Sequence, residues 1–142
     1  MRSRLSSPLV LGPALALVLL ACGTRAADNG FLFDALHGRT PYRASWDKLM
    51  KLVQPTPDWL VAFNRNFDGV ASQITSLTID GKPYEISFVC KPTECAAHKF
   101  AVLFDANGAH AYGALGGKDN DPAFFGDPSQ AEQEALTKEV KG

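Results

Sequence analysis

The residues best suited to a specific chemical role lie between two closely spaced cysteines. This segment reads Cys90, Lys91, Pro92, Thr93, Glu94 and Cys95. With Cys22 of the apolar N-terminal segment set aside, Cys90 and Cys95 are the two remaining cysteines, and an even number of cysteines in a domain outside the cytoplasm is expected to form disulfides. A proline fixes one backbone angle and removes one N–H donor. The pattern therefore predicts a rigid loop that presents a cation, a hydroxyl and a carboxylate.

Such a loop has two interpretations on residue chemistry alone. A rigid loop loses little entropy when it enters a cleft, and this is how a small inhibitor achieves tight binding. The alternative is a disulfide staple in a hairpin whose polar residues are simply exposed. The disulfide ring is very small, so we expect it to add only about 2 kcal/mol to global stability.

The histidines do not complete a metal site. A zinc site needs further Cys or His residues at ligand spacing. His98 lies close to Cys95, but His37 and His110 show no matching pattern. We therefore expect no metal to be bound at these residues.

The sequence also lacks the common catalytic motifs. It contains no G-x-S-x-G, no H-E-x-x-H and no Walker A segment. Residues 119–121 begin like a calcium loop, but Ala123 and Phe124 occupy positions that need a ligand and a glycine. We expect a protein that is not an enzyme and that uses no cofactor.

The N-terminus has the three parts of an export signal. Residues 1–4 carry two arginines, residues 9–21 are almost wholly apolar, and small residues flank Arg25 at a cleavage site. We expect residues 1–26 to be a signal peptide, residues 27–142 to form a single domain, and the mature protein to reside in the periplasm. No later segment is long and apolar enough to span a membrane. An alternative is lipid attachment at Cys22, because residues 19–22 resemble a lipobox.

The charge balance excludes one class of partner. The chain has 14 Lys+Arg against 15 Asp+Glu, without the basic stripe of a nucleic-acid-binding protein. Removing the three arginines of the leader leaves a net charge of −4. A mildly acidic domain suits a basic partner.

The element pattern predicts an α+β fold. Apolar spacing indicates short helices near 31–36, 45–53 and 58–61. Ser45 is the expected N-cap of the second helix. The two tryptophans, Trp46 and Trp59, are expected to be core anchors. Alternating residues then indicate four strands at 74–79, 84–88, 100–104 and 109–115, followed by a polar break over 116–121. Ser129 and Glu132 form a capping box for a helix to about Val140. We expect a central antiparallel meander flanked by helices.

Several segments, taken in order, carry a family resemblance. Residues 46–49 read W-D-K-L, residues 57–59 read P-D-W, and residues 101–104 read A-V-L-F after the C-K-P-T-E-C loop. Together with the leader and the acidic α+β domain, they resemble the Ivy family of periplasmic inhibitors of vertebrate lysozyme. The resemblance implies a c-type lysozyme as partner, with the disulfide loop inserted into its active-site cleft.

The chain departs from the family pattern at the loop tip. The best-known members place a histidine after Lys-Pro, whereas this chain has Thr93. Lys91 could supply a cation in its place, while Glu94 would be repelled by carboxylates in the cleft. Two other roles stay open: control of the cell's own lytic transglycosylases, and a non-inhibitory envelope interaction module. The sequence also leaves open whether the chain forms a homodimer.

Overall fold

The structure is a computed structural model that describes residues 30–142. The expected signal peptide (residues 1–26) and Cys22 lie outside the described residues. The elements are α1 (Leu32–Gly38), α2 (Thr40–Leu52), α3 (Asp58–Asn66), β1 (Val70–Ala71), β2 (Thr75–Ile79), β3 (Lys82–Cys90), β4 (Lys99–Asp105), β5 (Ala111–Gly117), β6 (Asn120–Phe125) and α4 (Gln130–Lys141). Within residues 30–142, no helix has the length and apolar character needed to cross a membrane.

The strands form one antiparallel sheet, which confirms the predicted α+β class. Its order is β1-β3-β4-β5-β6, and β2 pairs with β3 on the same side as β1. β2 pairs with the beginning of the long strand β3, and β1 pairs with its end, at Val89 and Cys90. The sheet therefore runs as the expected meander from β2 to β6.

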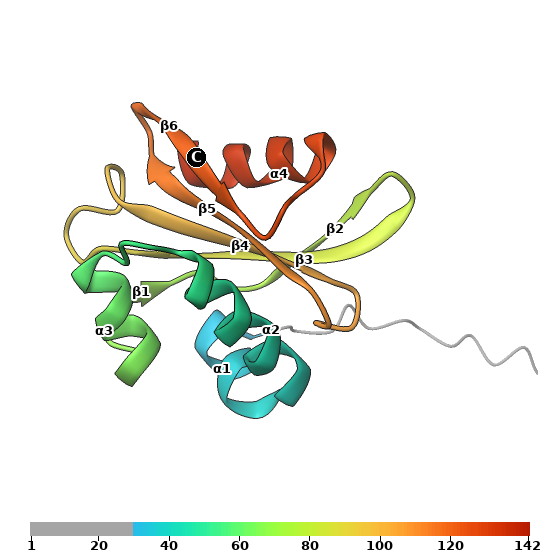
Figure 1. The fold of residues 1–142 in the computed structure, drawn as a ribbon, viewed down its shortest axis with the longest axis horizontal. Helices are drawn as coiled ribbons and strands as arrows, with labels where there is room; N and C mark the ends of the chain where they lie inside the picture. The colour runs from blue at the N-terminus through green and yellow to red at the C-terminus, as the bar shows by residue number, and fades with distance from the viewer. Residues whose placement is uncertain (1–29) are drawn as a thin grey trace, which may run out of the picture.

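Helices cover both faces of the sheet (Figure 1). Along β4, Phe100, Val102 and Phe104 pack into a core with α1, α2 and α3, whereas Ala101 and Leu103 pack into a second core with α4. Alternate residues of a strand point to opposite faces, so β4 is buried on both sides. The two cores fix the strand ends, and with them the loop between β3 and β4.

The last helix begins as the sequence predicts. The Ser129 hydroxyl accepts a hydrogen bond from the Glu132 amide at 3.4 Å, and the Glu132 carboxylate accepts one from the Ser129 amide at 2.7 Å. The other oxygen of this buried carboxylate accepts from the Tyr84 hydroxyl at 2.7 Å. This hydrogen bond, with burial, raises the pKa of Tyr84 to about 12. The capping box is confirmed, and it also ties α4 to β3.

The start predicted for the second helix was wrong. α2 begins at Thr40, with a proline in its first turn, a position where the missing proline N–H costs no hydrogen bond. Ser45 therefore lies inside the helix, where its hydroxyl donates to the Tyr42 carbonyl at 3.1 Å. Trp46 is fully buried, as expected of a core anchor, but Trp59 is only half-buried.

The number of strands was also underestimated, since the described residues form six strands and not four. The predicted polar break over 116–121 shrinks to a two-residue turn, and Asn120 already begins β6. β6 is an edge strand and contains Pro122. An edge strand tolerates proline because the N–H that proline lacks need not enter the ladder. The missed strand β1 has only two residues.

Candidate functional site

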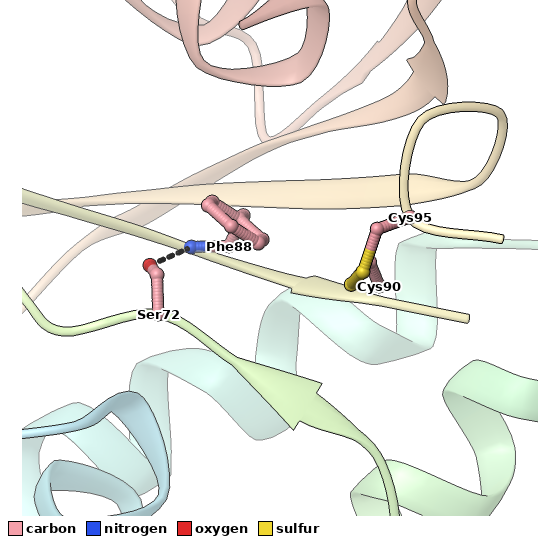
Figure 2. Close-up of a disulfide and its surroundings, with 4 residues drawn as sticks. All are labelled: Ser72, Phe88, Cys90 and Cys95. Atoms are coloured by element: carbon pink, nitrogen blue, oxygen red, sulfur yellow. Dashed lines mark hydrogen bonds between the residues drawn. A yellow bond between two sulfur atoms is a disulfide. The ribbon is translucent and has the colours of Figure 1, made fainter. Parts of the chain in front are cut away.

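The loop between β3 and β4 projects from one end of the sheet. Cys90 pairs in register with Lys99, so residues 91–98 form the connection. A disulfide joins Cys90 to Cys95 with their Cα atoms 4.9 Å apart, which confirms the predicted pairing (Figure 2). Cys90 is fully buried, so the disulfide ties the exposed part of the loop directly to the core.

The strand that carries Cys90 is itself held by Ser72, which lies in the gap between β1 and β2. The Ser72 hydroxyl accepts a hydrogen bond from the Phe88 amide at 2.9 Å (Figure 2). The Ser72 amide donates to the Phe88 carbonyl, also at 2.9 Å. A side chain thus replaces the missing ladder partner, and the end of β3 stays paired up to the disulfide.

The loop tip is a tight turn with an unusual residue in it. The Glu94 amide donates to the Lys91 carbonyl at 3.0 Å, and Pro92 and Thr93 occupy the two central positions. Thr93 has a φ of 66°, as the second central residue of a type II turn requires. Glycine and asparagine favour this conformation, whereas for a β-branched residue it is an outlier. The disulfide and the proline hold Thr93 there, with its side chain exposed.

The two charged residues of the tip bind each other. Lys91 and Glu94 form an ion pair whose side chains are 40% and 46% exposed. The hydrogen bond and the charge of Lys91 hold the pKa of Glu94 below its ordinary value. The Lys91 cation expected to stand in for the family histidine is therefore partly neutralised, and the repulsion expected from Glu94 is reduced.

A second turn and the β5–β6 hairpin hold the base of the loop through backbone hydrogen bonds. The Ala97 and His98 amides donate to the Glu94 carbonyl at 3.1 and 3.0 Å, and the Lys91 amide donates to the His98 carbonyl at 3.0 Å. From the hairpin, the Lys118 amide donates to the Ala96 carbonyl at 2.8 Å. The loop is thus fixed by backbone hydrogen bonds as well as by the disulfide.

Gly117 makes this support possible. A Cβ atom at Gly117 would lie only 2.1 Å from the Ala97 carbonyl oxygen, so any side chain there would displace the loop backbone. The sequence alone did not predict this contact. The only signal was the Gly116-Gly117 pair, which was assigned to the polar break.

The structure does not bring the three histidines together. His98 lies at the base of the loop, whereas His110 contacts Asp105 at 2.8 Å in the β4–β5 turn, and His37 packs edge-on against Phe67. Over residues 30–142, no group of three His, Cys, Asp or Glu residues is placed to hold a metal ion.

The chain is similar to a known protein family and to a curated protein. A family described as "Inhibitor of vertebrate lysozyme (Ivy)" matches residues 41–141, which include the loop and all six strands. A curated protein of Pseudomonas aeruginosa, named "Inhibitor of vertebrate lysozyme", is 29% identical to this chain over 152 aligned residues. The match covers 98% of this chain and 94% of that protein.

Proposed function

The chain belongs to the Ivy family of inhibitors of vertebrate lysozyme, and from that premise we propose that it inhibits a c-type lysozyme without being an enzyme itself. In this proposal, the loop closed by Cys90 and Cys95 enters the active-site cleft of the lysozyme. The observation that carries it is the tip, which is exposed yet fixed by a disulfide, a turn and the β5–β6 hairpin.

The chemistry of the tip fits a cleft with two carboxyl groups, which glycoside hydrolases of this kind use for catalysis. The Thr93 hydroxyl can donate to one carboxylate. The Lys91 ammonium has three donors, so it can keep its ion pair with Glu94 and still donate to a second carboxylate. Because Glu94 is already paired, its charge opposes entry into the cleft less than an isolated carboxylate would.

Rigidity is the second contribution of the loop. A flexible segment loses conformational entropy when it is fixed in a cleft, and this loss lowers affinity. Here the turn at residues 91–94 is already closed in the free protein. The mature domain has a net charge of −4 without its leader arginines, which would speed its association with a basic lysozyme at low salt.

The proposed location is the periplasm, reached through a signal peptide at residues 1–26. Intact-mass measurement of the exported protein tests this point. Loss of about 26 residues supports the proposal. A mature chain that begins at Cys22 with added acyl mass would instead place the protein on a membrane as a lipoprotein, and an unprocessed Met1 would contradict export.

Inhibition of a purified c-type lysozyme tests the proposed function. The mature protein is titrated into the lysozyme, and hydrolysis of bacterial cell walls is followed by the loss of turbidity. We expect saturable inhibition with one inhibitor per enzyme. If the folded, disulfide-bonded protein leaves hydrolysis unchanged, the proposal is wrong, and purified lytic transglycosylases are the next target to test.

A further inference from the structure

A groove of about 380 Å³ lies directly beside the loop. Its walls come from the start of α3, from the base of the loop and from the end of β5, elements that meet at one end of the sheet (Figure 1). The lining residues that matter here are Pro57, Trp59, Lys91, Ala97, His98 and Leu115. The groove is therefore continuous with the loop through Lys91, which belongs to both.

Trp59 gives this groove an aromatic wall. Its indole packs partly against the core under α1, α2 and α3, but it is not covered as the indole of Trp46 is. Leu115 is also half-buried. Among the residues that line the groove, Lys91 is the only Lys, Arg, Asp or Glu, and its ammonium is paired with Glu94. A weakly charged groove with an aromatic wall suits an apolar side chain more than an ionic group.

The size of the tip also indicates a second contact. A stable protein–protein interface covers about 800 Å² on each partner, far more than the four residues 91–94 can supply. Its affinity is usually concentrated in a few aromatic anchors surrounded by weaker contacts. Any partner that encloses the tip must also cover the surface next to it, which is where the Trp59 groove opens.

We infer that this groove receives an apolar side chain from the rim of the lysozyme cleft while the loop occupies the cleft itself. The inference rests on the proposed function. It makes Trp59 a binding residue, and it makes recognition depend on the enzyme surface outside the catalytic carboxyls. The loop would then block the reaction, and the groove would select among lysozymes whose rims differ.

Filling the groove tests this inference without removing any core contact. Ala97 is exposed and lines the groove, so Ala97→Leu places three extra carbons in it. Ala106→Leu is the matched control, because Ala106 is an exposed turn residue at the opposite end of β4. We expect Ala97→Leu to raise the Kd for immobilised c-type lysozyme at least tenfold and Ala106→Leu to leave it unchanged. Both variants should melt at the parent temperature.

Removing the aromatic wall gives a second test. We expect Trp59→Ala to weaken lysozyme binding at least tenfold. Phe33→Ala is its control, since Phe33 is another half-buried aromatic packed on the same core but does not line the groove. Equal melting temperatures for the two variants separate a binding effect from a folding effect. Lysozyme binding at parent strength by both Ala97→Leu and Trp59→Ala would overturn the inference.

The outcomes distinguish this inference from the proposed function. If the parent fails to bind lysozyme, the proposed function fails and the inference falls with it. If the parent binds and variants at residues 91–94 weaken binding while Ala97→Leu and Trp59→Ala do not, the groove inference alone fails. Titration of the free protein with chitotriose, followed by tryptophan fluorescence, covers a different occupant: saturable binding that Ala97→Leu abolishes would make the groove a sugar site and overturn the assignment to the enzyme rim.

Discussion

The two ends of the sheet turn the chain in different ways. At the end away from the loop, Asp80 and Gly81 connect β2 to β3 with φ values of 49° and 75°. Asp-Gly is among the sequences best suited to that turn, and no disulfide is present there. At the loop end, Thr93 has a similar φ of 66°, although a β-branched residue disfavours it.

This difference shows where the surrounding structure overrides local preference. The Asp80-Gly81 turn forms because its residues favour it. The Thr93 turn instead follows Pro92 inside the ring closed by the Cys90–Cys95 disulfide, and the base of the loop at Ala97 packs against Gly117. A disfavoured conformation that is held by its surroundings is typical of a site that binds something. The same contrast predicts that changes to the support of the loop affect binding more than folding.

The largest effect is expected from Gly117→Ala. The new methyl group would overlap the Ala97 carbonyl, so it should lower the free energy of unfolding by about 1–3 kcal/mol and displace the loop. We expect the Kd for c-type lysozyme to rise at least tenfold. Gly38→Ala is the control, because a Cβ built there has no atom within 4 Å apart from its chain neighbours and the backbone of its own helix. If Gly117→Ala binds lysozyme as the parent does, the hairpin does not support the binding conformation.

Removal of the disulfide should have the second largest effect on stability and lysozyme binding. The double variant Cys90→Ala/Cys95→Ala should lose about 2 kcal/mol of stability, because the closed ring is small. Lysozyme binding should weaken tenfold or more, about 1.4 kcal/mol, since Thr93 is then free to leave its turn. Thermal unfolding and surface plasmon resonance measure the two quantities. Unchanged binding would show that the backbone hydrogen bonds alone hold the tip.

Thr93→His should tighten binding by about 1–2 kcal/mol, the order of one charge-assisted hydrogen bond. Histidine also tolerates the left-handed region better than threonine does. Thr93→Asn separates these contributions, because asparagine relieves the backbone without adding an imidazole. We expect Thr93→Ala to change inhibition much less than Thr93→His does. If Thr93→His does not tighten binding while Lys91→Ala removes most of the inhibition, then Lys91 and not residue 93 makes the contact on which inhibition depends.

The smallest effect is expected from Lys91→Met, which removes the ion pair of the tip and changes the pKa of Glu94. Because Lys91 lowers the pKa of Glu94, the pair persists as the pH falls through the ordinary range of a glutamate and is lost only below it. An NMR titration of the Glu94 carboxyl should therefore give a lower midpoint in the parent than in Lys91→Met. Equal midpoints would mean that the pair does not form in solution.

Local patterns were enough to predict much of this fold. The Ser129–Glu132 capping box and the strand predicted at 84–88 depend on residues close in sequence, and both appear in the structure. The disulfide was predicted because only two cysteines remain after the leader. These features follow from local preference and chemical type.

Other features depend on contacts between distant segments, which one sequence does not reveal. β6 contains Pro122 and shows little alternation, so its sequence favours a loop. It forms a strand because it pairs with β5 at the edge of the sheet. Tryptophan is a residue type that usually packs in the core, yet the position of Trp59 at the end of the sheet leaves it half-buried beside the loop. The support of the loop by Gly117 likewise depends on how the β5–β6 hairpin meets residues 96–97.

Competition for the lysozyme cleft tests the central claim most directly. Fluorescently labelled chitotriose is bound to a c-type lysozyme, and the mature protein is added while the anisotropy of the sugar is recorded. Insertion of the Cys90–Cys95 loop into the cleft predicts complete release of the sugar, with an apparent inhibition constant that rises linearly with the sugar concentration. A stable complex that holds lysozyme, sugar and this protein together would contradict the account.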